Sequence, residues 1–438
     1  MKTFSIVITT DGSDIIDRVP ADDGFFKTLT TFSETSKNAV IMGLNTFNAL
    51  GVLSDRIVIV VTATSLHVNH RFLHVTSRLN NALQIAGEIG CDRVFVVGGR
   101  QLFQTALQSS YLECIYQLSA TGVSSNKLLT PVPPGASEIR LPTHVKYLLP
   151  LHEEFQYLHL LRRVLTDGST RKTRNGVVRS LFGEQLTFDL QHFPLYTTKK
   201  MFLRGVFEEL KFFLLGCTNS KILEEKGVNI WQANTSRHFL DSMGFPDRKE
   251  GDMGPMYFFN VLHYGTDYVD CDTDYSGQGY NQFEYVLHQL RTDPHSRRIL
   301  FTTFNPLNAQ RGVLYPCHGL ITQFYVEADK LSCSVTIRSN DLICGNPFNV
   351  ASYALLVYIM CQLLDNIYQP GKLIMFINDA HIYEQHLEVA HQLLTREPYP
   401  FPTLSFRKPI HTVADMEWSD VILSNYRCHP PMKVNMVP

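Results

Sequence analysis

Apolar residues in the first third of the chain form short runs, separated by longer segments in which apolar and polar positions mix. Such alternation is typical of an α/β fold, in which helices cover the faces of a largely parallel sheet. Runs rich in β-branched residues predict buried strands at 6–9, 39–43, 56–62 and 93–99. The segments between them predict helices at 23–32, 79–89 and 101–109.

The pattern changes at residues 121–150, where prolines and few periodic apolar positions predict a linker. A short strand is expected only around residues 145–148. We therefore expect a first domain of residues 1–130, a proline-rich linker of residues 131–152 and a second domain of residues 153–438.

The second domain mixes longer helical patterns with strands, which predicts an α+β fold around a large mixed sheet. A polar, basic loop is expected at 166–179. Helices are expected at 155–165, 197–215, 218–226 and 350–364, the last of them apolar enough to be buried. Strands are expected at 298–304, 320–327, 330–338 and 372–378.

Composition narrows the class of protein. Of the 438 residues, 44% are hydrophobic and 18% are charged, which is an ordinary globular balance. The net charge of −2 argues against a general nucleic-acid binder, so RNA is not an expected partner. Nine scattered cysteines fit a reducing compartment and give no disulfide or zinc framework, so no metal site is expected.

Targeting signals are absent from the pattern. No apolar run approaches the ~20 residues of a membrane span. Residues 1–8 enter a strand-like run at once, which leaves no room for a cleavable targeting segment. We expect a cytoplasmic location, without excluding an organelle.

Cys317 is the first candidate for chemistry. The sequence LYPCH at 314–318 places it at the edge of a predicted strand, where a thiolate can be exposed. A lone cysteine is more often a buried structural residue. The motifs that follow Cys317 in the sequence favour a catalytic role for it. They are RSND at 338–341, GNPFN at 345–349 and NDAHIY at 378–383.

These segments resemble thymidylate synthase, and the resemblance covers nearly all of the second domain. The chain also contains, in the order of the family, IWQAN at 230–234, FLD at 239–241, EGD at 250–252 and GPMY at 254–257.

The resemblance implies reductive methylation of dUMP to dTMP. Cys317 would attack carbon 6 of the pyrimidine, and carbon 5 would then take up the methylene group of methylenetetrahydrofolate, which also supplies the hydride. Glu209 would organise the proton transfer through water. The alternative interpretation of Glu209 is an exposed helix residue beside Glu208.

The phosphate of dUMP needs several guanidinium groups. By resemblance these are Arg297, Arg298 and Arg338, and the adjacent pair would reach into the site of a partner subunit, so we expect a homodimer. The alternative for the pair is a solvated surface position. The fourth arginine is best matched by Arg174, with Arg171 or Arg179 as alternatives.

The resemblance assigns the remaining ligand contacts. Asn349 would read the uracil edge, because an amide offers both a donor and an acceptor. The other dUMP contacts would come from Tyr257, Ser339, His381 and Tyr383, and the folate contacts from Trp231, Asp341, Gly345 and Phe348. For Trp231 and Phe348 the alternative is ordinary core packing.

The second domain departs from the family pattern around Cys317. Ile337 stands for a glutamine, Val261-Leu262 for Trp-Arg, Tyr315 for a proline, Asn378 for a glycine and Pro438 for an apolar residue. These departures keep a second hypothesis open. It is a catalytically inactive paralogue that serves as a structural or interaction subunit of a larger assembly.

The first domain resembles dihydrofolate reductase, with PAD at 20–22, AVIMG at 39–43 and VFVVGG at 94–99 as the main matches. The resemblance implies that Asp22 and Arg56 bind folate and that Gly98-Gly99 let the backbone approach NADPH. The alternative for Asp22 is a helix N-cap.

Departures in the first domain concern the cofactor. Leu44 and Ala63 stand where basic residues would meet the phosphate of NADPH, and Leu118 replaces a threonine. The last strands of the family are expected to be truncated into the linker. Without bound NADPH there is no hydride source, so reductase activity is not expected.

Overall fold

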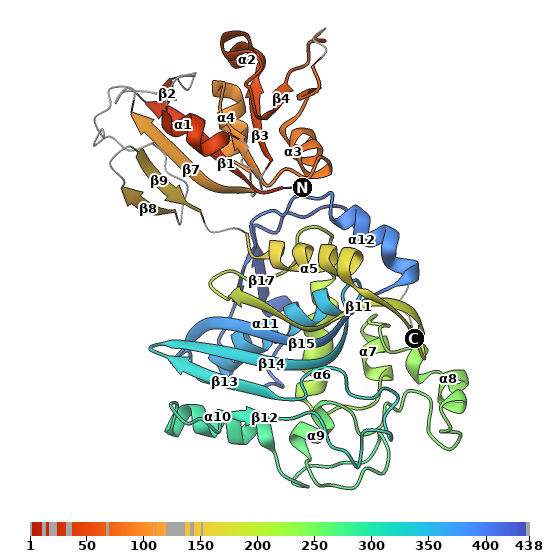
Figure 1. The fold of residues 1–438 in the computed structure, drawn as a ribbon. Coiled ribbons are helices and arrows are strands. Elements are labelled where there is room, and N and C mark those ends of the chain that lie inside the picture. Colours follow the sequence, from red (N-terminus) through yellow and green to blue (C-terminus); the bar gives the residue numbers. More distant parts are fainter. Residues whose placement is uncertain are drawn as a thin grey trace. The chain divides into compact units, whose positions relative to one another are not determined.

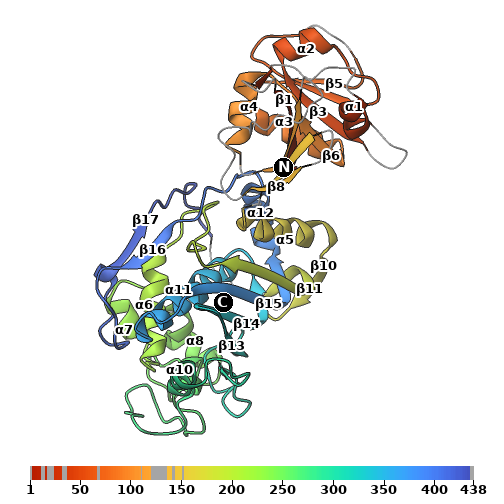
Figure 2. The same ribbon diagram turned by 90° about the vertical axis from the view of Figure 1, so that its left-hand side faces the viewer.

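The computed structural model describes residues 2–10, 15–16, 24–31, 37–66, 70–109, 111–119, 136–140, 144–149 and 152–434. It divides into two compact units, Met1–His152 and Glu153–Pro438 (Figures 1 and 2). The second unit begins at the residue where the second domain was expected to begin.

The described residues of the first unit form a nine-stranded mixed sheet in the order β5-β4-β3-β6-β1-β7-β9-β8, with β2 paired to β1. Neighbours from β5 to β7 are parallel, as predicted, and β9 is antiparallel to β7 and β8. The strands are β1 (Phe4–Thr10), β2 (Ile15–Ile16), β3 (Asn38–Gly43), β4 (Ile57–Val61), β5 (Leu73–Thr76), β6 (Arg93–Val96), β7 (Leu112–Ser119), β8 (Ser137–Arg140) and β9 (His144–Leu148).

Strands β8 and β9 lie in the segment that the sequence predicts to be a linker. The last strands are therefore present in the sheet instead of being truncated. Of β9, Val145 and Tyr147 bury apolar side chains at alternating positions. The short strand expected around residues 145–148 is therefore confirmed as β9, whereas β8 was not predicted.

The helices of the first unit follow the strands. In α3, the buried residues Leu79, Ala82, Leu83 and Ala86 recur at helical spacing. Helix α2, which the sequence analysis did not predict, begins directly after β3. The helices are α1 (Gly24–Thr30), α2 (Leu44–Leu50), α3 (Leu79–Glu88) and α4 (Arg100–Leu107).

The second unit is built on a six-stranded sheet in the order β10-β11-β15-β14-β13-β12. Only β14 and β15 are parallel neighbours, so the sheet is mixed, as predicted. The strands are β10 (Ser169–Thr173), β11 (Gly176–Asp189), β12 (Leu300–Phe301), β13 (Thr322–Glu327), β14 (Lys330–Asp341) and β15 (Gln369–Tyr383). A separate hairpin pairs β16 (Thr403–Phe406) with β17 (Val421–Ser424).

The two faces of this sheet differ. One face packs on the buried helix α11 (Gly345–Leu363), which lies alongside β14 and β15 (Figure 1). The opposite face exposes the large apolar side chains of Tyr325, at 66%, and Phe376, at 44%. We call these two residues the open sheet face.

The remaining elements surround the sheet. They are α5 (Glu154–Asp167), α6 (Leu203–Leu214), α7 (Lys221–Glu225), α8 (Arg237–Ser242), α9 (Phe258–Leu262), α10 (Gln282–Thr292) and α12 (Leu387–Leu393), with short 3-10 turns at Ala233–Thr235, Glu384–His386 and Trp418–Asp420. Among the described residues, no helix has both the length and the apolar character needed to cross a membrane.

Two predicted elements of the second unit are wrong. The loop expected at 166–179 contains the end of α5 and most of the β10–β11 hairpin, whose first strand is exposed and so lacks an apolar signal. The helix expected at 197–215 begins only at Leu203. Thr197 and Thr198 each donate their backbone N–H and their hydroxyl to the buried Glu154 carboxylate at 2.6–2.9 Å, and these hydrogen bonds fix a non-helical segment.

Candidate active site

Cys317 lies in the loop before β13 and is partly buried. Its Sγ is 3.1 Å from the hydroxyl of Tyr257, which precedes α9 in a left-handed conformation with φ 41°. Its carbonyl accepts hydrogen bonds from the backbone N–H of Arg338, at 2.8 Å, and of Ser339, at 3.4 Å. The nucleophile candidate is therefore held by β14 on one side and by a buried tyrosine on the other.

Burial raises the pKa of the Cys317 thiol. The Tyr257 hydrogen bond and the charge of Arg338 act in the opposite sense, whereas the nearby Glu209 raises the pKa further. Arg338 thus helps ionisation, as the sequence predicts, but burial outweighs it.

His318 and Tyr353 are site residues that the sequence analysis missed. His318 stacks on the Tyr257 ring at 4.4 Å, and its Nδ1 lies 2.9 Å from the Tyr353 hydroxyl. Burial lowers the pKa of His318 to about 4, so the imidazole is neutral. Its position beside Cys317 in the sequence was the available signal.

Glu209 lies on α6 and is partly buried. It accepts a 2.8 Å hydrogen bond from Trp231 Nε1, and burial raises the pKa of its carboxyl to about 7. The alternative of an exposed helix residue is wrong, since Glu209 is partly buried. Its neighbour Glu208 is also buried and pairs with Lys226 at 2.7 Å. A carboxyl that titrates near neutrality suits proton transfer.

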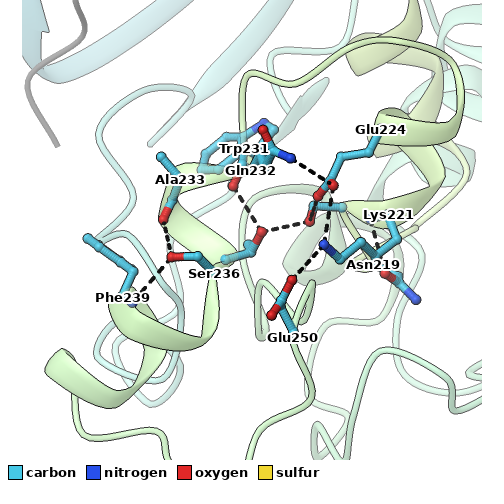
Figure 3. Close-up of polar contacts among 11 residues, drawn as sticks. Asn219, Lys221, Glu224, Trp231, Gln232, Ala233, Ser236, Phe239 and Glu250 are labelled. Atoms are coloured by element: carbon cyan, nitrogen blue, oxygen red, sulfur yellow. Dashed lines mark hydrogen bonds and ion pairs between the residues drawn. The ribbon is translucent and has the colours of Figure 1, made fainter.

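The loop that carries Trp231 is braced by polar contacts (Figure 3). Thr235 donates to the Trp231 carbonyl at 2.9 Å and lies 2.7 Å from Ser220. Gln232 donates to Glu224, which also pairs with Lys221 at 3.2 Å. The loop therefore fixes the indole that holds Glu209.

Asn349 ends a buried row of polar side chains. Its Oδ1 accepts from Asn340 Nδ2 at 2.8 Å, Asn340 Oδ1 accepts from Asn346 Nδ2 at 2.7 Å, and Asn346 Oδ1 accepts from the Tyr196 hydroxyl at 3.0 Å. Gly345 lies beside this row, because a Cβ there would stand 3.7 Å from both Asn340 Nδ2 and Asn349 Oδ1.

Asp341 caps the turn before α11, where its Oδ1 accepts from the N–H groups of Ile343 and Cys344. Asp341, Cys344 and His386 each bring one potential metal-ligand atom within 4.8 Å of the others. Burial raises the pKa of the Cys344 thiol to about 12, and the Lys199 ammonium donates to the Ile343 carbonyl beside it. A protonated thiol and a neighbouring cation oppose metal binding.

His381 and Tyr383 lie together at the end of β15, with their rings 5.2 Å apart and edge to face. His381 Nδ1 is 3.3 Å from Asp379 Oδ1, and this contact lowers the pKa of Asp379. Gly176 of the β10–β11 hairpin lies against the Tyr383 ring. The hairpin therefore borders the expected ribose site.

The three candidate arginines of the hairpin differ in their partners. Arg171 pairs with Asp379 at 2.9 Å, and Arg179 donates to the Leu165 carbonyl at 2.6 Å. Arg174 is exposed at the turn and bonds to the adjacent Asn175, and its charge acts on Tyr383. Unlike the other two, Arg174 makes its hydrogen bond within the turn itself.

The other predicted arginines lie at the surface. Arg338 donates to the carbonyls of Pro316 and Tyr315 at 3.2 and 3.3 Å, and its guanidinium lies over the Tyr315 ring. Arg297 and Arg298 are exposed between α10 and β12. The single chain does not bring this pair into a recorded contact with Cys317.

The remaining predicted residues have mixed surroundings. Phe348, on α11, and Trp231 are partly buried against the main core of the second unit. Ile337 is buried on the core side of β14, where it packs as an apolar residue in place of the expected glutamine. Val261 and Leu262 are buried in α9.

In the first unit, Arg56 is buried. Its guanidinium donates to the Thr30 hydroxyl at 2.8 Å and to the Ser54 carbonyl at 2.9 Å, and burial lowers its pKa. Asp22 lies outside the described residues. A folate carboxylate would meet an arginine that already has internal partners.

Gly98 and Gly99 lie between β6 and α4. Gly98 accepts from the Gly43 N–H at 2.8 Å, and a Cβ at Gly43 would stand 3.3 Å from Gly99 N. Leu44 begins α2 directly after Gly43, and Ala63 is exposed after β4. At this edge a ligand could approach the backbone of Gly98 and Gly99 closely, but Leu44 and Ala63 offer it no cation.

Together, the second unit presents a thiol held by a tyrosine and a carboxyl that titrates near neutrality, the features of an enzyme with a cysteine nucleophile and a general acid–base. A thymidylate synthase family model matches residues 155–438, and a dihydrofolate reductase family model matches residues 6–126. The chain belongs to the bifunctional dihydrofolate reductase–thymidylate synthase family.

Its relatives support both halves. The bifunctional dihydrofolate reductase-thymidylate synthase of Leishmania major is 34% identical over 498 residues, which cover 100% of this chain and 95% of the relative. That of Zea mays is 33% identical, with 96% and 92% covered. A thymidylate synthase of human herpesvirus 8 is 44% identical over 287 residues, 65% of this chain and 84% of its own.

Proposed function

We propose that the second unit converts dUMP to dTMP with methylenetetrahydrofolate as co-substrate. The observation that carries the proposal is the group around Cys317, in which Tyr257 contacts Sγ and Glu209 has a pKa of about 7. The names of the relatives agree with this activity. These intact contacts favour an enzyme over an inactive paralogue.

The proposed steps assign one role to each group. The Cys317 thiolate adds to carbon 6 of the pyrimidine, and carbon 5 forms a bond to the methylene carbon of the folate. Glu209, through water, accepts the proton that leaves carbon 5. Hydride from the folate ring reduces the methylene to a methyl group, and Cys317 leaves, which gives dTMP and dihydrofolate.

We further propose that the working form is a homodimer joined through the open sheet face. Tyr325 and Phe376 expose large apolar side chains on this face, which is costly in water. Arg338 lies on the same side of β14 as Thr336, the partner of Phe376, so this face borders Cys317. A second copy would bring Arg297 and Arg298 to the phosphate.

For the first unit we propose folate binding without dihydrofolate reduction. Leu44 and Ala63 offer no charge to the phosphate of NADPH, so these residues do not fit the cofactor, and no hydride step is assigned here. Arg56 remains as the expected folate contact.

The synthase proposal is tested by the variant Cys317→Ser. We expect loss of dTMP formation with dUMP binding mostly retained, because a hydroxyl is a far weaker nucleophile and the phosphate site is untouched. Spectrophotometric turnover and calorimetry with dUMP measure the two effects. Absence of turnover in the wild-type protein would favour the inactive paralogue.

A further inference from the structure

We propose that Tyr196, Asn346 and Asn340 form a hydrogen-bond relay that fixes the amide of Asn349 in the orientation that reads uracil. The relay thereby sets the preference for dUMP over dCMP. This inference rests on the proposed function, since it requires the pyrimidine to face Asn349.

The relay is buried at Tyr196 and reaches solvent at Asn349. Tyr196, Asn346 and Asn340 are each at most 2% exposed, whereas Asn349 is partly exposed. Its three hydrogen bonds measure 3.0, 2.7 and 2.8 Å. Buried amides without partners are costly, so these side chains hold one another in place.

The relay has a direction. Each buried amide turns its oxygen toward Tyr196 and its nitrogen toward Asn349. Reversal would turn all three amides and make the Tyr196 hydroxyl an acceptor, which would leave its own proton without this partner. The Glu154 carboxylate, whose charge acts on Tyr196, already accepts four hydrogen bonds from Thr197 and Thr198.

The direction determines what Asn349 offers to a base. Its Oδ1 uses one lone pair for Asn340 and keeps the other for the N3–H of uracil, while its NH2 group donates to O4. Cytosine presents an acceptor at N3 and a donor at N4, and it needs the turned amide. Turning Asn349 would place two NH2 groups against each other, at Asn340 and Asn349.

The test compares three variants of the full-length protein. Tyr196→Phe removes the donor that sets the direction. In Asn340→Asp, a carboxylate oxygen replaces the NH2 group that donates to Asn349. Because this oxygen can only accept, the variant favours the turned amide of Asn349. The matched control is Tyr157→Phe, because Tyr157 is a buried tyrosine, stacked 4.4 Å from Tyr196, whose hydroxyl donates outside the relay to the Leu342 carbonyl.

The measurement is the ratio of dCMP to dUMP dissociation constants by calorimetry. We expect the ratio to fall about 3–10-fold in Tyr196→Phe, to fall further in Asn340→Asp and to stay unchanged in Tyr157→Phe. A merely structural role would weaken both ligands equally and leave the ratio unchanged, which overturns the relay. If Asn340→Asp does not fold, Tyr196→Phe decides alone, and a wild-type protein that does not bind dUMP overturns the proposed function as well.

Discussion

At the residue scale, Glu209 and Cys317 are partly buried in the second unit, and burial raises the pKa of each. The sequence predicted both groups, but it could not predict their protonation. Their environment comes from α6, the Trp231 loop and Tyr257, which are distant in sequence. The same holds for His318, whose stacking on Tyr257 is a tertiary contact.

Glu209 gives a pH-dependent prediction. Its pKa is 4.5 without the fold and about 7 with it, so the folded protein holds the extra proton in this window. Its contribution to stability is present below pH 4.5 and is lost as the pH rises through 7. In Glu209→Gln this loss disappears. We therefore expect the free energy of unfolding of the variant to exceed that of the wild type by about 1–3 kcal/mol at pH ~8, and to differ by about zero at pH ~4.5.

Urea unfolding of both proteins at the two pH values measures this difference. We also expect Glu209→Gln to lose most dTMP formation, because an amide cannot exchange the proton. A stability difference that does not change with pH would contradict the raised pKa.

Tyr257→Phe tests the contact at Sγ. The hydroxyl lowers the pKa of Cys317, so its loss should raise that pKa and slow alkylation by iodoacetamide about 2–10-fold near pH 8. Tyr280→Phe is the control, because Tyr280 is exposed and lies outside the open sheet face. Faster alkylation in Tyr257→Phe would show that the tyrosine shields the thiol instead of stabilising the thiolate.

At the element scale, the β10–β11 hairpin contains the three candidates for the fourth phosphate-binding arginine. The sequence predicted its basic character but took it for a loop, because β10 is exposed and has no apolar alternation. Its pairing with the end of β15 places it beside His381 and Tyr383. That pairing joins segments far apart in the chain, so the hairpin sequence alone does not predict it.

Arg174→Ala should raise the KM for dUMP by about 10–100-fold, as expected for the loss of a charge-assisted hydrogen bond to phosphate. Arg171→Ala should have a smaller effect on KM and should lower the melting temperature, because it breaks the pair with Asp379. Binding of deoxyuridine, which lacks the phosphate, is the control for both. A larger KM effect in Arg171→Ala would reassign the fourth arginine.

At the scale of the whole molecule, the division into two units and both fold classes follow from the alternation of apolar runs and from the motifs. Strand β8 does not, because it lies in proline-rich sequence where only the short strand β9 was expected. The open sheet face also escaped the sequence analysis, because Tyr325 and Phe376 come from strands that are far apart in the chain.

The dimer predicts complementation between inactive subunits. Cys317→Ser and the double variant Arg297→Ala, Arg298→Ala should each be inactive or nearly so alone. In a mixed dimer, one site combines an intact Cys317 with the partner's intact arginines, so co-expression should restore about a quarter of wild-type activity. No restoration in co-purified mixed dimers would mean that the arginines act within their own chain.

The two units differ in their expected ligands. Loss of two charge-assisted hydrogen bonds weakens NADPH binding by roughly two to four powers of ten. Calorimetry of the full chain saturated with 5-fluoro-dUMP should show a second folate or antifolate site but no NADPH binding at physiological concentration. Tight NADPH binding with steady dihydrofolate reduction would make both units active.

The central claim, that Cys317 is the nucleophile of a thymidylate synthase, is tested most directly by intact-mass spectrometry after incubation with 5-fluoro-dUMP and methylenetetrahydrofolate. The fluorine cannot leave carbon 5 as a proton does, so the covalent complex should persist. The account predicts one adduct per chain, attached to Cys317 and absent in Cys317→Ser. An unmodified Cys317 in protein that binds both ligands would contradict it.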